Sequence, residues 1–245
     1  MTASILIGCV LLGAALGSLG GLLGTGGGTF AIPALVLMMG YDQKLAQGTA
    51  LVMVVGNVIK ALLRYRHHSG LDLKLATLLA VTGSAASAIS AHYSLQMSAE
   101  RLQQFYGIFL LTLAAFVFLT HRSAAAKEAK PWQWAAIPGL IGGTSLGLFG
   151  VGGAMLAVPM LVLFHGQSQI RAQGLGLALA VPGCAITLAQ YTASGQVQWI
   201  PAIALAAGGL IGVSPGVALA HRIPAQMLTK IFCLFLVVAS LIMLQ

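Results

Sequence analysis

Charged residues are scarce in this sequence. Lys, Arg, Asp and Glu together make up 7% of its 245 residues, whereas hydrophobic residues make up 58%. A soluble domain usually carries about 25% charged residues, because they hydrate its surface. So small a charged fraction excludes an ordinary soluble domain, since only a lipid-facing surface needs no such hydration. The sequence therefore predicts one membrane domain in a lipid bilayer.

Acidic residues and cysteines are especially few. The four carboxylates are Asp42, Asp72, Glu100 and Glu128, and none lies in the middle of a long apolar run. A buried carboxylate relay of the kind that carries protons through pumps is therefore not expected. The three cysteines lie in apolar stretches without metal-ligand spacing, so we expect no metal site, no cofactor and no catalytic residue.

Long apolar runs dominate what is present. A helix needs about 20 mostly apolar residues to cross a bilayer. Runs of about this length cover residues 2–23, 45–63, 73–95, 102–119, 175–191, 199–220 and 227–244. The net charge of +8 lies mainly in short segments between these runs, which is typical of cytoplasmic loops and not of a nucleic-acid interface.

The sequence contains an internal repeat with an offset of 126 residues. Residues 24–50 match residues 150–176 at 13 of 27 positions, far above chance. We therefore divide the chain into a first membrane repeat (1–121), a polar cytoplasmic linker (122–132) and a second membrane repeat (133–245).

The sequence of each repeat predicts an apolar segment, a glycine cluster, a short apolar piece and three full-length spans, in that order. The short pieces, residues 29–39 and 155–164, are too short for an ordinary crossing. The basic loops fall at different positions in the two repeats, which favours an all-α protein of two inverted repeats. A parallel repeat with four crossings per half also fits the sequence.

The two glycine clusters are the most informative segments. Each is followed by a proline six residues after its first GlyGly pair, and each is expected to break a helix. Broken backbone in a membrane is tolerated where it lines a protein-covered site, and a helix that restarts there favours an anion. The alternative is that these glycines only allow close helix packing. The candidate substrate-binding residues at the clusters are Thr25, Gly26, Gly27, Gly28, Thr29, Val151, Gly152 and Gly153.

An Ala-Gln-Gly triplet follows each cluster and adds Gln47 and Gln173 to the candidate site. An uncharged amide offers two N–H donors to an oxyanion. Helix–helix contact, or a near-surface position at the start of a span, explains these glutamines equally well. Further along the same spans, a polar path is predicted from Thr49, Asn57, Thr187 and Gln190.

Two enzymatic interpretations are weaker. The glycines follow no β-strand, as a dinucleotide fingerprint would require. The segment Gly143 to Gly147 superficially matches a serine-hydrolase motif, with Ser145 as nucleophile, but it lies in an apolar repeat segment. An intramembrane enzyme is thus kept only as an alternative, and we expect a protein that is not an enzyme.

The repeated glycine cluster, proline and Ala-Gln-Gly together resemble the sulfite exporter TauE/SafE family, also called the toluene-sulfonate uptake permease group. The resemblance covers the whole chain. It implies a multi-pass protein of the bacterial cytoplasmic (inner) membrane that transports sulfite, sulfonates or related organosulfonate anions such as sulfoacetate.

From the residues and the resemblance together, we expect an anion transporter that alternates access between its two repeats. A passive anion channel is the main alternative. The expected partners are a small anionic substrate and the bilayer, without nucleic acid; the oligomeric state is left open, a homo-oligomer included.

Overall fold

The computed structural model describes all residues except 1–2, 24–26, 67–71, 121–130, 152, 221–224 and 245. The described residues form α-helices and one short 3-10 helix, with no strand among them, so the all-α prediction is confirmed. The elements are α1 (Ala3–Leu23), α2 (Gly28–Met39), α3 (Gln43–Arg66), α4 (Leu73–Gln96), α5 (Ala99–Thr120), η1 (Trp132–Ala135), α6 (Ala136–Phe149), α7 (Gly153–His165), α8 (Gln169–Ala193), α9 (Trp199–Ala220) and α10 (Ala225–Met243).

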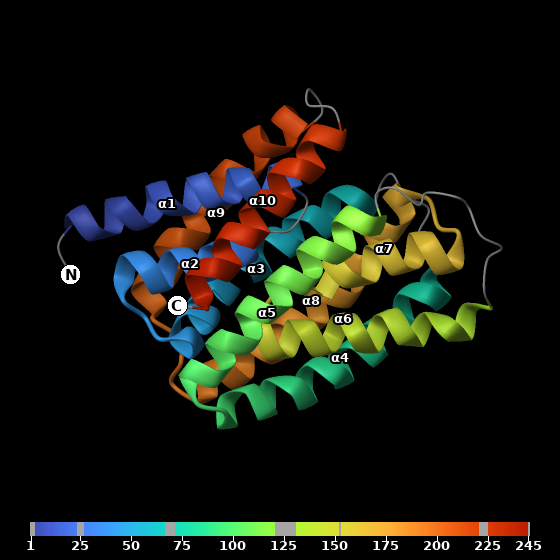
Figure 1. Ribbon diagram of the computed structural model, residues 1–245, viewed down its shortest axis with the longest axis horizontal. Helices are drawn as coiled ribbons and strands as arrows, with labels where there is room; N and C mark the ends of the chain where they lie inside the picture. The colour runs from blue at the N-terminus through green and yellow to red at the C-terminus, as the bar shows by residue number, and fades with distance from the viewer. Residues whose placement is uncertain are drawn as a thin grey trace. The chain divides into compact units, whose positions relative to one another are not determined.

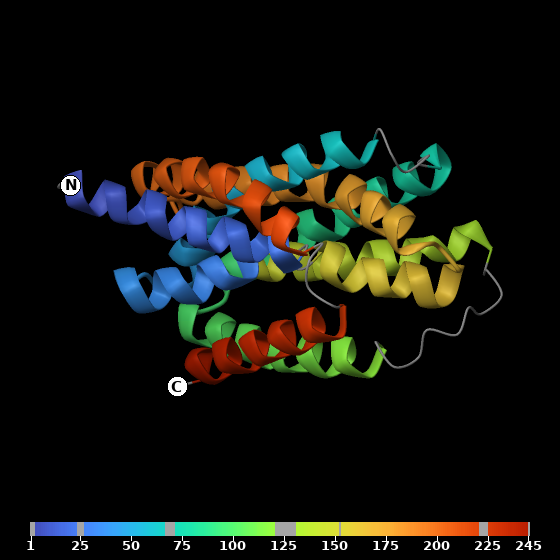
Figure 2. The same cartoon turned by 90° about the horizontal axis from the view of Figure 1, so that it is seen from above.

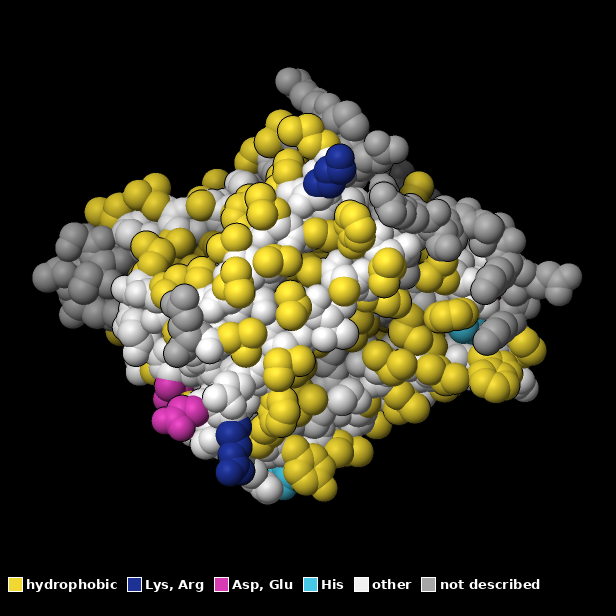
Figure 3. All heavy atoms as spheres, viewed as in Figure 1, with side chains coloured by type: hydrophobic (Ala, Val, Ile, Leu, Met, Phe, Trp, Pro, Cys, Tyr) yellow, Lys and Arg dark blue, Asp and Glu magenta, His cyan; other side chains and the backbone are white. Residues whose placement is uncertain are grey.

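Each long apolar run of the sequence overlaps one of these helices, although the apolar parts of α1 and α10, Leu6–Leu22 and Thr229–Met243, are shorter than a full span. Among the described residues, five segments are long and apolar enough to cross a membrane: Gln43–Leu63, Leu73–Gln96, Ala99–Leu119, Ile170–Ala193 and Trp199–Gly216. Hydrophobic side chains cover much of the face seen in Figure 3, where charged side chains appear at few places. Such a surface suits lipid better than water.

The helices form two compact units, each with helices from both sequence repeats. The first unit comprises Met1–Asn57, Met97–Arg122 and Tyr191–Gln245, and the second comprises Val58–Gln96 and Ser123–Gln190. In the first unit, therefore, α1, α2, the first part of α3 and α5 of the first repeat fold with the end of α8, α9 and α10 of the second. In the second unit, α4 of the first repeat folds with α6, α7 and most of α8.

Close packing of α1 along α9 organises the first unit (Figure 1). A Cβ atom added to Gly17 would lie 2.4 Å from the carbonyl oxygen of Gly209, and one added to Gly21 would lie 2.5 Å from that of Val213. Contacts advance in the same direction along both helices, so α1 and α9 are parallel. Only glycine permits so close an approach of two backbones.

Helices α5 and α10 also pack together in the first unit, in opposite directions (Figure 2). The Gln103 amide near the start of α5 donates to the carbonyl of Met243 at the end of α10, at 3.2 Å. One turn further along α5, the Ser240 hydroxyl donates to the carbonyl of Gly107 at 2.8 Å. These bonds join the two helices inside an apolar layer, where few other polar groups compete.

In the second unit, α4 and α6 form a seam much like that of α1 and α9 (Figure 1). A Cβ atom added to Gly143 would lie 2.2 Å from the carbonyl oxygen of Gly83, and one added to Gly147 would lie 2.2 Å from that of Ser87. The two helices are again parallel. Beside them, an apolar core joins α4, η1, α7 and α8, with Leu79, Leu161 and Leu179 fully buried in it.

Candidate functional site

The first glycine cluster separates α1 from α2 in the first unit. Helix α1 ends at Leu23 and α2 begins at Gly28, after Gly27 in the left-handed conformation with φ of 85°. A Cβ atom at Gly27 would also lie 2.9 Å from the carbonyl oxygen of Leu16. This position therefore requires glycine both for its backbone angle and for close contact. The predicted site residues Thr25 and Gly26 lie outside the described residues.

The start of α2 is buried. Gly27, Gly28 and Thr29 are all buried, and no side chain caps the helix. The Gly27 carbonyl accepts bonds from the amides of Phe30 and Ala31, at 3.2 and 3.1 Å. From α5, the Tyr106 hydroxyl donates to the Thr29 carbonyl at 3.1 Å. First-turn amides such as that of Gly28 have no acceptor within their own helix, and this favours a negative charge at the helix start.

The second glycine cluster separates α6 from α7 in the second unit. Here the left-handed glycine is Gly150, with φ of 69°, and its amide donates to the Leu146 carbonyl to close α6. Val151 is buried, and Gly153 opens α7 in tight contact with α6 and α8. Gly152 lies outside the described residues. Both short helices contain a proline, Pro33 in α2 and Pro159 in α7.

The first Ala-Gln-Gly triplet binds the end of α8 and the loop that follows it, all within the first unit. The Tyr191 hydroxyl donates to Oε1 of Gln47 at 2.6 Å. Gly48 lies directly under the same loop, because a Cβ atom there would be 1.9 Å from the carbonyl oxygen of Gln196. Next along α3, the Thr49 hydroxyl accepts a bond from the amide of Gln198 at 3.2 Å. Three successive residues of α3 thus contact the end of α8 and this loop.

The first two turns of α3 also contain buried amide atoms that have no hydrogen-bond partner. Gln47 is fully buried, and while its Oε1 accepts from Tyr191, its Nε2 has no hydrogen-bond partner. One turn earlier, Gln43 is also fully buried, and neither its Nε2 nor its Oε1 has a partner. A buried polar atom without a partner costs about 1–3 kcal/mol, so native proteins seldom keep such atoms without a reason. Gln43 is not among the residues predicted from the sequence, although Gln169 repeats it 126 residues later.

Some predicted site residues lie apart within the first unit. Gly27 contacts the Met53 side chain, which follows Gln47 on α3 by six residues, or about 9 Å along a helix. The Gln47 amide instead contacts Tyr191, at the end of α8. In the second unit, Gln173 is only half-buried in the second turn of α8.

The predicted polar path has residues in both units. In the first unit, Thr49 and Asn57 are buried along α3. In the second unit, the Thr187 hydroxyl donates to the Gly183 carbonyl of its own helix at 2.9 Å, and the Gln190 amide donates to the Ala88 carbonyl of α4 at 3.0 Å. The last two side chains therefore support helix structure and packing.

Comparison with known proteins now assigns the family. The sequence profile of the family described as Sulfite exporter TauE/SafE matches residues 9–243, nearly the whole chain. The chain belongs to this family. The resemblance stated from the glycine clusters and Ala-Gln-Gly triplets is thereby confirmed.

Curated relatives of this TauE/SafE protein carry transporter names. A probable membrane transporter protein of Xylella fastidiosa (strain 9a5c) is 27% identical over 251 residues, which cover 98% of this chain and 95% of the relative. Probable membrane transporter protein YunE of Bacillus subtilis (strain 168) is 23% identical over 258 residues, covering 93% of each. No solved structure matches the chain. The family and these names indicate a membrane transporter and not an enzyme.

The geometry around Ser145 agrees with this assignment. The segment Gly143 to Gly147 lies inside α6, whereas a hydrolase elbow joins a strand to a helix. The Ser145 hydroxyl is buried and donates to the Gly142 carbonyl at 2.9 Å. Among the described residues, no group of three or more His, Cys, Asp or Glu side chains could hold a metal ion.

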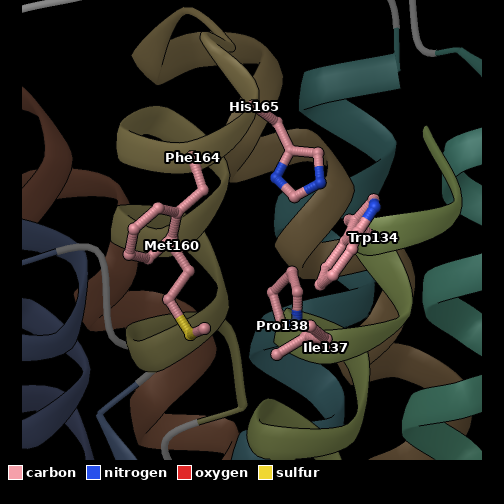
Figure 4. Close-up of a pocket in the computed structure, with 6 residues that line it drawn as sticks. All are labelled: Trp134, Ile137, Pro138, Met160, Phe164 and His165. Carbon is pink, nitrogen blue, oxygen red and sulfur yellow. The ribbon is translucent and has the colours of Figure 1, made fainter. Parts of the chain in front are cut away.

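One pocket lies in the second unit, between η1, α6 and α7 (Figure 4). It has a volume of about 250 Å³ and is lined by Trp134, Ile137, Pro138, Met160, Phe164 and His165. In Figure 4, Trp134 and His165 lie on one side and Phe164 and Met160 on the other. This lining is almost wholly apolar, so it is poorly suited to a small oxyanion.

Proposed function

We propose that this TauE/SafE protein carries a small sulfur-containing anion, such as sulfite, a sulfonate or a sulfoacetate-like compound, across the bacterial cytoplasmic membrane. The observation that carries the proposal is the fully buried Gln47, whose Nε2 has no partner while Tyr191 occupies its Oε1. An uncharged N–H donor held inside an apolar protein suits the oxygen atoms of a desolvated anion.

The glycine clusters support the same function. Each unit contains a short helix that begins at a glycine break, α2 at Gly28 and α7 at Gly153. Helix starts stabilise negative charge through their unpaired amides and the helix dipole. Paired breaks at matching repeat positions are the usual location of a substrate site in secondary transporters. We assign substrate contacts in each unit by itself: the start of α2 and Gln47 in the first unit, and the start of α7 and Gln173 in the second.

We further propose that the two repeats have inverted topology and that access to the substrate site alternates through movement of one repeat against the other. Helices α5 and α10 occupy equivalent positions in the two repeats. They run antiparallel within one compact unit, as their bonds from Gln103 to Met243 and from Ser240 to Gly107 require. Equivalent helices of a parallel repeat would run the same way, so this direction supports inversion.

Uptake into proteoliposomes tests the proposed substrate and site together. Wild-type protein is expected to take up labelled sulfite or methanesulfonate with saturation. The double variant Gln47→Ala/Gln173→Ala is expected to lose most of this uptake, because it removes the amide donor from each unit. Wild-type uptake kinetics in the double variant would overturn the site assignment, and absence of uptake by the wild type would overturn the substrate class.

A further inference from the structure

We infer that Gln43 and Gln47 form an amide pair that binds a singly charged oxyanion, and that Tyr191 is a positioning residue for this pair. The inference rests on the proposed function and names a substrate contact that the sequence analysis missed. It places this contact in the first two turns of α3, under the loop between α8 and α9.

The geometry of α3 places Gln43 and Gln47 on one face of the helix. Residues that are four positions apart lie on one face of a helix, with their Cβ atoms about 5–6 Å from each other. Both side chains are 0% exposed, and three of their four polar side-chain atoms have no partner: Nε2 and Oε1 of Gln43, and Nε2 of Gln47. Each Nε2 offers two N–H bonds. Two adjacent amides therefore present up to four donors to the oxygens of one ligand.

Tyr191 decides which end of the Gln47 amide is available. Its hydroxyl donates to Oε1 of Gln47 at 2.6 Å, and the tyrosine itself is fully buried. An amide can exchange its oxygen and nitrogen by rotating through 180°. In the orientation present, the tyrosine hydroxyl donates to Oε1, and Nε2 points elsewhere. This orientation leaves a donor, and not an acceptor, available for an anion.

The charge of the site indicates the charge of its ligand. The amide pair is neutral, and the charged neighbours of Gln43 in the sequence, Asp42 and Lys44, have opposite signs. Neutral donors can offset the desolvation of one charge, whereas the desolvation penalty of an ion rises with the square of its charge. We therefore assign a monoanion such as a sulfonate in preference to a dianion such as sulfate.

The internal repeat supports a shared role for the first glutamine. Gln43 and Gln47 are matched by Gln169 and Gln173 at the same offset of 126 residues. Both copies therefore contain two glutamines with one helical turn between them. The hydroxyl at position 49 is not repeated, because Leu175 takes its place.

Gln43→Met tests the pair, because methionine has a similar length and no strong hydrogen-bonding group. The variant is expected to raise KM for methanesulfonate about tenfold in proteoliposomes, the effect of losing one good hydrogen bond to a charge, with kcat within about twofold. Since it removes two unpartnered buried atoms, it is also expected to raise the Tm of the purified, substrate-free chain by about 2–4 °C.

The matched control is Gln103→Met. This glutamine bonds α5 to α10 in the same unit, so its loss is expected to lower Tm and leave KM unchanged. If Gln43→Met likewise lowers Tm, its amide already has protein partners and the inference is overturned, whatever happens to KM. An unchanged KM in Gln43→Met overturns it as well.

Tyr191→Phe tests the positioning role. Phenylalanine keeps the ring that packs beside Gly48 and removes only the hydroxyl. We expect KM to rise about three- to tenfold with little change in kcat, because the Gln47 amide can then rotate. A lower Tm with wild-type KM would show a purely structural bond and contradict this role.

Two anions separate this inference from the proposed function. Methanesulfonate is expected to raise the wild-type Tm at lower concentration than sulfate does. Tighter binding of sulfate would contradict the monoanion assignment. A wild type that neither binds nor transports sulfite, methanesulfonate or sulfate would overturn the proposed function and the assigned ligand together. Wild-type transport with unaltered KM in Gln43→Met would overturn the amide pair alone.

Discussion

The two Ala-Gln-Gly triplets have the same sequence and different surroundings. In the first unit, Gln47 is fully buried and bonded to Tyr191, and Gly48 lies against the backbone of the loop after α8. In the second unit, Gln173 is half-buried. A repeated motif therefore does not imply equal roles for its copies, and the first copy combines loop contact with an available donor.

The largest effect is expected from Gly48→Ala. The new Cβ atom would lie 1.9 Å from the Gln196 carbonyl oxygen, so the loop after α8 would have to move. We expect a destabilisation of about 2–3 kcal/mol, measured as loss of Tm in detergent.

Gly56→Ala on the same helix is the control for Gly48→Ala. Its Cβ would meet only the Leu210 side chain, at 3.8 Å or more, so the variant is expected to keep or slightly raise stability. Equal losses of Tm in the two variants would show that α3 tolerates no added methyl group at either position. The loss in Gly48→Ala could then not be attributed to its contact with the loop.

The single variants Gln47→Ala and Gln173→Ala compare the two triplets directly. Gln47→Ala removes the bond that the buried Tyr191 hydroxyl donates to Gln47, which is expected to cost about 1–3 kcal/mol. Replacement of the half-buried Gln173 by alanine is expected to lower the free energy of unfolding by less than about 1 kcal/mol. Thermal unfolding measures both, and a greater loss in Gln173→Ala would reverse the comparison.

A smaller effect is expected from Thr49→Val, which keeps the shape of the side chain and removes the acceptor for the Gln198 amide. The expected loss is about 1 kcal/mol of stability. Thr112→Val serves as its control, because that exposed hydroxyl bonds only within its own helix and its loss should have almost no effect. Equal stability of Thr49→Val and the wild type would show that this bond does not hold the loop.

Much of the fold could be predicted from apolar run length. Each long run overlaps a helix, and the run 199–220 coincides with α9. The glycine clusters also lie where one helix ends and the next begins. Partner choice could not be predicted, because α1, α4, α6 and α9 all carry stripes of small residues. Which stripes pair depends on the whole packed unit.

The candidate site could be predicted only in part. Gln47 could be identified because its Ala-Gln-Gly triplet occurs twice in the chain, at the same place in each repeat. Gln43 is also repeated, as Gln169, but an isolated glutamine at a span end resembles an ordinary surface residue. Its burial becomes evident only once the surrounding helices are in place. The bond from Tyr191 to Gln47 joins residues 144 apart in the sequence, which local patterns cannot predict.

Counterflow tests the central claim most directly. Proteoliposomes that contain wild-type protein are loaded with unlabelled methanesulfonate or sulfite and then diluted into a trace of the labelled anion. A transporter that alternates access at a saturable anion site should accumulate label transiently above its equilibrium level. Label that only equilibrates, with a flux linear in concentration, would instead indicate a passive channel and contradict the account.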